Sequence, residues 1–87
     1  MYSQRFKKNV RLTHHVIARM EKRDISLELL LDLIETGSVR NRSETDLWIY
    51  KSYPGRADNM VCTAVVVGQA VVVKTVMVDW ILEEPQT

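Results

Sequence analysis

The residues with the clearest chemical potential are His15, Arg19 and Arg23, which follow one another at intervals of four. In an α-helix, side chains four residues apart lie on the same face. An imidazole titrates near neutral pH, while a guanidinium keeps its charge and matches the oxygens of a phosphate group. A helix that carries these three side chains would therefore suit nucleic-acid contact or phosphodiester chemistry.

The same segment also has an ordinary structural interpretation. Val16, Ile17 and Met20 can form the apolar side of the helix, which leaves its cations as a solvated face. Under this interpretation, His15 makes only a local hydrogen bond near the helix start. Both interpretations stay open at this point.

Metal-independent cleavage of RNA defines what each candidate would do. The reaction needs a base for the 2′-hydroxyl, an acid for the leaving oxygen and cations for the phosphate in the transition state. His15 is the candidate acid–base residue, and Arg19 and Arg23 are the candidate phosphate ligands. Further candidate contacts to nucleic acid are the cations Lys7, Lys8, Arg11, Lys51 and Arg56. Lys51 has the alternative role of protecting a sheet face or edge.

Metal and cofactor sites are not expected. The adjacent His14 and His15 would point about 100° apart on a helix, and neither CxxC nor HExxH spacing occurs. The three glycines are too scattered to form a phosphate-binding loop. The lone Cys62 lies in an apolar segment and is expected to act as a small core hydrophobe.

Length and composition indicate one small globular domain. The chain has 87 residues, of which 46% are hydrophobic and 26% charged, values that argue against disorder. No apolar run is long enough to span a membrane, and the basic N-terminus lacks the apolar region of a signal peptide. Together with a single cysteine, these features predict a cytoplasmic protein.

The near-neutral net charge of +1 hides a strong asymmetry. Residues 1–23 contain seven basic residues and one acid, for a net charge of +6, whereas the remainder has a net charge of −5. A basic segment on an acidic body is expected when one face meets an anionic partner. That partner could be nucleic acid, an acidic protein surface or the acidic part of a second copy.

Hydrophobic periodicity predicts the helical part of the domain. Residues 10–12 alternate as a short strand, and Thr13 is a candidate N-cap for a helix that ends near Arg23. Ser26 would cap a second helix with a leucine-rich apolar stripe, and Gly37 would end it.

From residue 38 onward the period changes to two. Strands are predicted over residues 47–53, 60–67 and 70–78, with a Pro-Gly loop at 54–59 and a tight connection at Gly68. The expected fold is α+β, with a short N-terminal strand and two helices on one face of an antiparallel sheet of three to four strands. The expected organisation is a basic and flexible arm at 1–9, one domain at 10–82 and a flexible tail at 83–87.

One further pattern connects these residues to a known family. The sequence resembles a family of small bacterial proteins classed as a domain of unknown function. The matching residues are His15, Arg19-Met20, Arg23, Ile25-Ser26, Gly37 after the second predicted helix and the late strand Val73-Lys74-Thr75-Val76. That family is similar to the RelE-like and barnase/EndoU/colicin ribonuclease toxins, whose fold has two N-terminal helices packed on an antiparallel sheet.

The resemblance implies specific roles. It implies His15 as the acid–base residue, Arg19 and Arg23 on the substrate side, and Thr75 as a further member of the catalytic set. The family usually has glycine where this chain has Asp24, and an aromatic residue where it has Met77. An acid beside Arg23 would weaken its charge, which leaves room for a relative that has lost activity.

Three hypotheses follow. In the first, the protein binds RNA or a protein partner, such as a cognate inhibitor, through its basic N-terminal helix without catalysis. In the second, it is an active metal-independent ribonuclease that uses His15. In the third, it is a structural homodimer with no role in nucleic-acid binding. None of the three requires a cofactor or a membrane.

Overall fold

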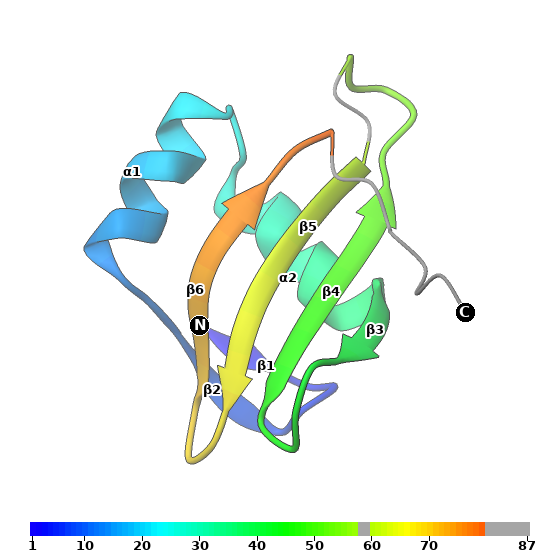
Figure 1. Ribbon diagram of the computed structural model, residues 1–87. Coiled ribbons are helices and arrows are strands. Elements are labelled where there is room, and N and C mark those ends of the chain that lie inside the picture. The colour runs from blue at the N-terminus through cyan, green and yellow to red at the C-terminus, as the bar shows by residue number, and fades with distance from the viewer. Residues whose placement is uncertain (58–59, 80–87) are drawn as a thin grey trace.

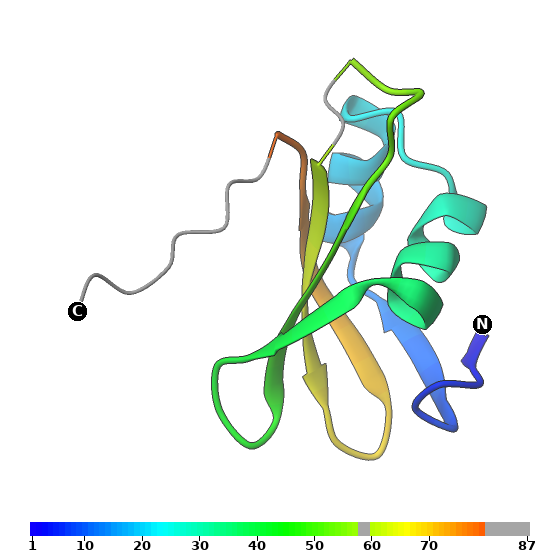
Figure 2. The same cartoon turned by 90° about the vertical axis from the view of Figure 1, so that its right-hand side faces the viewer.

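The computed structural model describes residues 1–57 and 60–79 and has the expected α+β architecture. Figure 1 shows the elements along the chain, and Figure 2 shows that both described helices lie on the same side of the sheet. Their bounds are β1 Tyr2–Ser3, β2 Lys8–Leu12, α1 His14–Lys22, α2 Leu27–Thr36, β3 Ser38–Asn41, β4 Asp46–Ser52, β5 Met60–Val67 and β6 Val71–Met77. Neither α1 nor α2 is long and apolar enough to cross a membrane.

Both helices begin at the residues that the sequence predicts. The Thr13 hydroxyl accepts a hydrogen bond from Val16 N, and the Ser26 hydroxyl accepts one from Leu29 N. Each cap supplies an acceptor for an amide that has no partner within the helix. Gly37 ends α2, with its own amide bonded to the Leu33 carbonyl.

The sheet is larger than predicted and is mixed rather than antiparallel. Its six strands run in the order β1-β2-β6-β5-β4-β3, and β2 pairs with β6 in parallel. The prediction of three to four antiparallel strands missed β1 and β3, which are short edge strands without a strong apolar pattern. It also missed the parallel pairing, because that pairing joins the two ends of the sequence and leaves no local signal.

The core lies between the sheet and the two helices. Val16 and Met20 from α1 and Leu30, Leu33 and Ile34 from α2 are buried there. The sheet contributes alternate residues of its central strands, with one register shift in β6 between Val73 and Val76: Leu47, Ile49, Val61, Val65, Val71, Val73 and Val76. This alternation fixes which residues of each strand face the helices and which face away.

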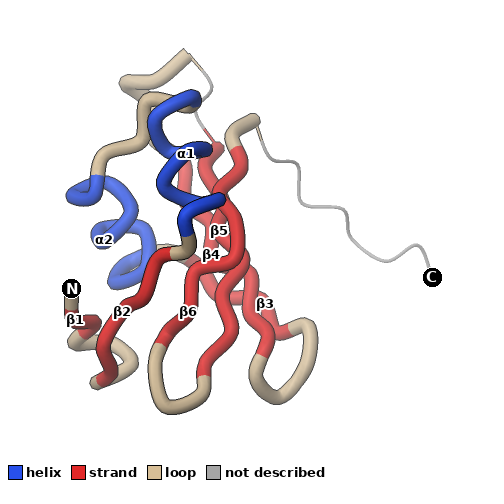
Figure 3. The backbone as a smooth tube through the Cα atoms, turned by 90° about the vertical axis from the view of Figure 1, so that its left-hand side faces the viewer, coloured by secondary structure: helices blue, strands red, loops and turns tan. Residues whose placement is uncertain are grey.

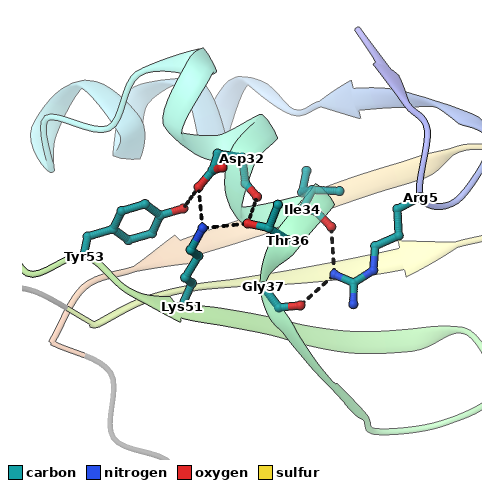
Figure 4. Close-up of polar contacts among 7 residues, drawn as sticks. All are labelled: Arg5, Asp32, Ile34, Thr36, Gly37, Lys51 and Tyr53. Carbon is teal, nitrogen blue, oxygen red and sulfur yellow. Dashed lines mark hydrogen bonds and ion pairs between the residues drawn. The ribbon is translucent and has the colours of Figure 1, made fainter.

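The N-terminal residues, expected as a flexible arm, form β1 and the turn into β2. The Glu35 carboxylate accepts hydrogen bonds from the Ser3 hydroxyl and from the amides of Gln4 and Arg5. Arg5 Nη1 donates to the carbonyls of Ile34 and Gly37 at 3.1 and 2.6 Å, at the C-terminal end of α2 (Figure 4). This segment therefore supports α2. The predicted tail at 83–87 lies outside the described residues.

Candidate nucleic-acid interface

The end of α1 directs Arg23 away from the core. Ile25 N bonds to the Met20 carbonyl at 2.9 Å and Asp24 N bonds to the Glu21 carbonyl at 3.3 Å, which is the Schellman pattern of helix termination. Asp24 occupies the left-handed position of this motif, with a φ of 55°. Glycine is the usual residue at this position of the motif. Asp24 therefore differs from the usual residue in its backbone preference as well as in its charge.

Arg56, from the loop between β4 and β5, contacts this helix end directly. Its Nη2 donates to the Arg23 carbonyl at 2.7 Å and its Nη1 donates to the Asp24 carbonyl at 2.8 Å. Carbonyls at a helix C-terminus lack partners within the helix and favour a cation. Two predicted contact residues that are 33 positions apart in the chain are thus brought together.

An open cleft of about 530 Å³ lies where these segments meet. The residues that line it are Lys22, Arg23, Asp24, Gly55, Arg56, Ala57 and Asp79. Neither Lys22 nor Arg23 forms an ion pair with any other described residue. Asp24 and Asp79 both have positive φ, so the two acids of the cleft also carry its unusual backbone conformations. A second hollow is lined mainly by apolar residues, among them Ile17 of α1 and Leu27 of α2.

Arg19 contacts β6, and His15 precedes it by one helical turn on α1. Arg19 Nε donates to the Val76 carbonyl at 3.5 Å, and Figure 3 shows α1 running beside β6. Four helical residues rise about 6 Å, which matches roughly two strand residues. We therefore expect the exposed His15 to lie at about the same height along β6 as Lys74. Lys74 is the extra residue of a β-bulge, because Val73 pairs with Val65 and Thr75 with Ala64.

The predicted catalytic set does not converge on one point. Val76 belongs to the core beneath the helices, so its neighbour Thr75 faces the opposite side of the sheet. His15 and Arg19 instead belong to α1, on the helix side. Arg23 joins Arg56 at the cleft, beyond the end of β6.

Lys51 holds α2 to the sheet and lies away from the cleft. Its Nζ lies 3.0 Å from Asp32 Oδ2 and donates to Thr36 Oγ1 at 2.8 Å (Figure 4). The Tyr53 hydroxyl donates to the same Asp32 oxygen at 2.6 Å. The hydrogen bond from Tyr53, followed by that from Lys51, lowers the pKa of Asp32. Lys51 thus has a structural role that its position in the sequence did not reveal.

The other predicted contact residues lie elsewhere on the sheet. Lys7 directly precedes β2 and Lys8 is the first residue of that strand, near the connection between β5 and β6, whereas the cleft lies at the opposite end of these strands. Arg11 pairs in register with Val72 and is exposed. Of the nine predicted residues, only Arg23 and Arg56 line the cleft.

Lys22 and Asp79 line the cleft but were not predicted as site residues. The position of Lys22 beside Arg23 at the end of a predicted helix was a signal that could have identified it. Asp79 follows a strand whose place in the sheet was not readable, so no local pattern marked it.

Metal ligands and known relatives complete the description. Among residues 1–57 and 60–79, no three His, Cys, Asp or Glu side chains gather closely enough to hold a metal ion. Cys62 is buried, and burial raises the pKa of its thiol to about 12, as fits a core residue.

Comparisons of this chain with protein-family models, curated proteins and solved structures give no match.

Proposed function

We propose that this protein binds nucleic acid, specifically RNA, through the cleft between α1 and the β4–β5 loop. The observation that carries the proposal is the contact of Arg56 with the backbone of Arg23 and Asp24. This contact gathers Arg23, Arg56 and the neighbouring Lys22 around one open cleft. Phosphate groups are the ligands for which such cations are best suited.

The electrostatics of the cleft support an anionic ligand. Like charges held close together repel, and a bound phosphate would relieve that repulsion. The carboxylates of Asp24 and Asp79 offset part of the positive charge, which favours moderate and strongly salt-dependent affinity. A cytoplasmic location, in keeping with the free and buried Cys62, forms part of the proposal.

Binding to a fluorescently labelled single-stranded RNA tests this function. Replacing Lys22 or Arg23 with alanine should weaken binding and reduce the slope of log K against log salt by about one per cation removed. Lys7→Ala and Lys8→Ala are matched controls, because they remove the same charge from the other end of the sheet. Equal losses for cleft and control variants would contradict a specific role for the cleft.

RNA cleavage is the second candidate function. The observation that favours it is the exposure of His15 one turn before Arg19, which itself contacts β6. Cleavage of labelled RNA in the presence of EDTA by the wild type, but not by His15→Ala, would establish a metal-independent ribonuclease. If the folded wild-type protein leaves the RNA intact, the function is binding alone.

A further inference from the structure

The side of the sheet away from the helices combines aromatic and cationic residues. Residues of β3, β4, β5 and β6 that alternate with the core positions face this side, here called the open face. Its members include Arg40, Trp48, Tyr50, Ala64, Thr75 and, from β2, Arg11. Figure 2 shows that neither described helix covers it.

Trp48 lies at the centre of one row across the open face. The register places Arg40 and Ala64 on either side of Trp48, with Thr75 beyond Ala64. The guanidinium of Arg42 lies 4.9 Å from the centre of the Trp48 ring system, within the range of a cation–π interaction. Ala64 is small and half-buried, so a planar group can lie beside the indole without meeting a long side chain.

The charges of this face match those of a polyanion. Arg11, Arg40 and Arg42 supply three cations, whereas the described acids at this end of β4 are Asp46 and, in the connection before it, Glu44. An aromatic ring flanked by arginines is a surface on which unpaired bases stack while phosphates meet the cations. A duplex keeps its bases stacked inside, so this chemistry selects single strands.

The open face is also continuous with the cleft. β6 carries Thr75 and Met77 on this face and leads directly to Asp79, which lines the cleft. β4 carries Trp48 and Tyr50 and leads to the loop that contains Arg56. The distance from Trp48 to the end of β4 at Ser52 is about 13 Å, from the rise of a strand. One short strand of nucleic acid can therefore reach both surfaces.

We infer that the open face is a base-stacking site centred on Trp48 and that the ligand is single-stranded RNA. This inference rests on the proposed function and adds a class of ligand to it. The cleft holds phosphates, and Trp48 stacks against a base of the same strand, with Arg42 and Arg40 beside it. Thr75, separated from His15 by the sheet, then belongs to this second surface.

The test compares two labelled polymers with the same number of phosphates, an RNA oligonucleotide and its abasic counterpart. Wild-type protein should bind the RNA about 5- to 150-fold more tightly, the range for stacking of one base. Trp48→Ala should remove this preference and leave abasic affinity unchanged, whereas Trp48→Phe should keep most of it. Ala64→Leu, which fills the space beside the indole, should also reduce the preference while leaving Trp48 in place. Circular dichroism establishes that each variant is folded.

The outcomes separate this inference from the proposed function. If Trp48→Ala and Ala64→Leu keep the preference for bases, the stacking site is overturned, although binding at the cleft stands. Equal affinity of the wild type for both polymers overturns it as well. Binding of neither polymer would overturn both the stacking site and the proposed function.

Discussion

Arg56 donates a hydrogen bond from Nη2 to the carbonyl of Arg23 at 2.7 Å, so that two arginines meet at the end of α1. The contact joins the loop between β4 and β5 to the terminus of a helix and forms one wall of the cleft. The position of the Arg56 guanidinium relative to Arg23 therefore depends on the hydrogen bonds of the Arg56 side chain.

Replacement of Arg56 should affect both binding and the attachment of its loop. Arg56→Ala removes one cation and two hydrogen bonds, so RNA affinity should fall and the salt slope should decrease by about one. Arg56→Lys keeps the charge but cannot bond both carbonyls with the same planar geometry. If the geometry matters, the lysine variant should keep the wild-type slope and still bind more weakly. Fluorescence anisotropy at several salt concentrations measures both effects, and wild-type binding by both variants would contradict them.

Asp24→Gly should stabilise the protein by about 0.5–1 kcal/mol. Glycine adopts the positive φ of this position without the steric cost that other residues have. This gain exceeds the opposing effect of glycine on the unfolded protein, whose chain becomes more flexible. Asp24→Ala removes the same carboxylate, but alanine, unlike aspartate, has no short polar side chain that makes the left-handed conformation more tolerable, so it should destabilise the protein. Chemical denaturation separates the two effects. Both variants should bind RNA more tightly than the wild type, since each removes an acid from the cleft.

Gly37→Ala should destabilise the fold by about 1–3 kcal/mol, the usual cost of overpacking. A Cβ at this position would lie 2.6 Å from the Leu33 carbonyl oxygen, 2.8 Å from Ile49 Cγ2 and 3.0 Å from the Tyr50 carbonyl oxygen. Gly68→Ala is the matched control, because a Cβ there meets nothing within 4 Å. Thermal unfolding followed by circular dichroism should show a loss at Gly37 alone, and equal losses at both positions would contradict the packing argument.

Stability in acid should depend on Asp32. The folded-state pKa of Asp32 lies below its ordinary value of 3.8, mainly because of the hydrogen bond from Tyr53. A lowered folded-state pKa contributes stability above the ordinary pKa, and this contribution is lost as pH falls through the folded-state value. Asp32→Asn should therefore differ most from the wild type near neutral pH, and the difference should shrink as pH falls through the ordinary value of 3.8 and below it. The carboxylate is partly exposed, so the effect should stay below about 1 kcal/mol.

Stability at alkaline pH should depend on Tyr53, and here stability should fall as pH rises. Burial, followed by the hydrogen bond to Asp32, raises the pKa of Tyr53 above its ordinary value of 10.0. Its contribution to stability is present in full below that ordinary value and is lost as pH rises beyond it. Tyr53→Phe should lack this alkaline loss when the two proteins are compared by urea denaturation on either side of about pH 10. Parallel curves for both proteins would contradict the assignment.

The sequence predicted local structure better than the relationships between distant segments. Thr13 and Ser26 cap the helices as expected, because a capping hydroxyl acts within three residues of its own position. The parallel pairing of β2 with β6 and the contact of Arg56 with Arg23 depend on the complete fold. The role of Lys51 was missed for the same reason, since its partner Asp32 lies on another element.

The most direct measurement is an NMR titration of isotopically labelled protein with a short RNA that carries 2′-O-methyl groups, which prevent cleavage through the 2′-hydroxyl. The amide signals of residues 22–24 and 55–57 should shift in proportion to bound RNA, and the shifts should weaken as salt concentration rises. The amides of Lys7 and Lys8 should remain in place. An absence of shifts at the cleft, or shifts confined to the β1–β2 end, would contradict RNA binding at this site.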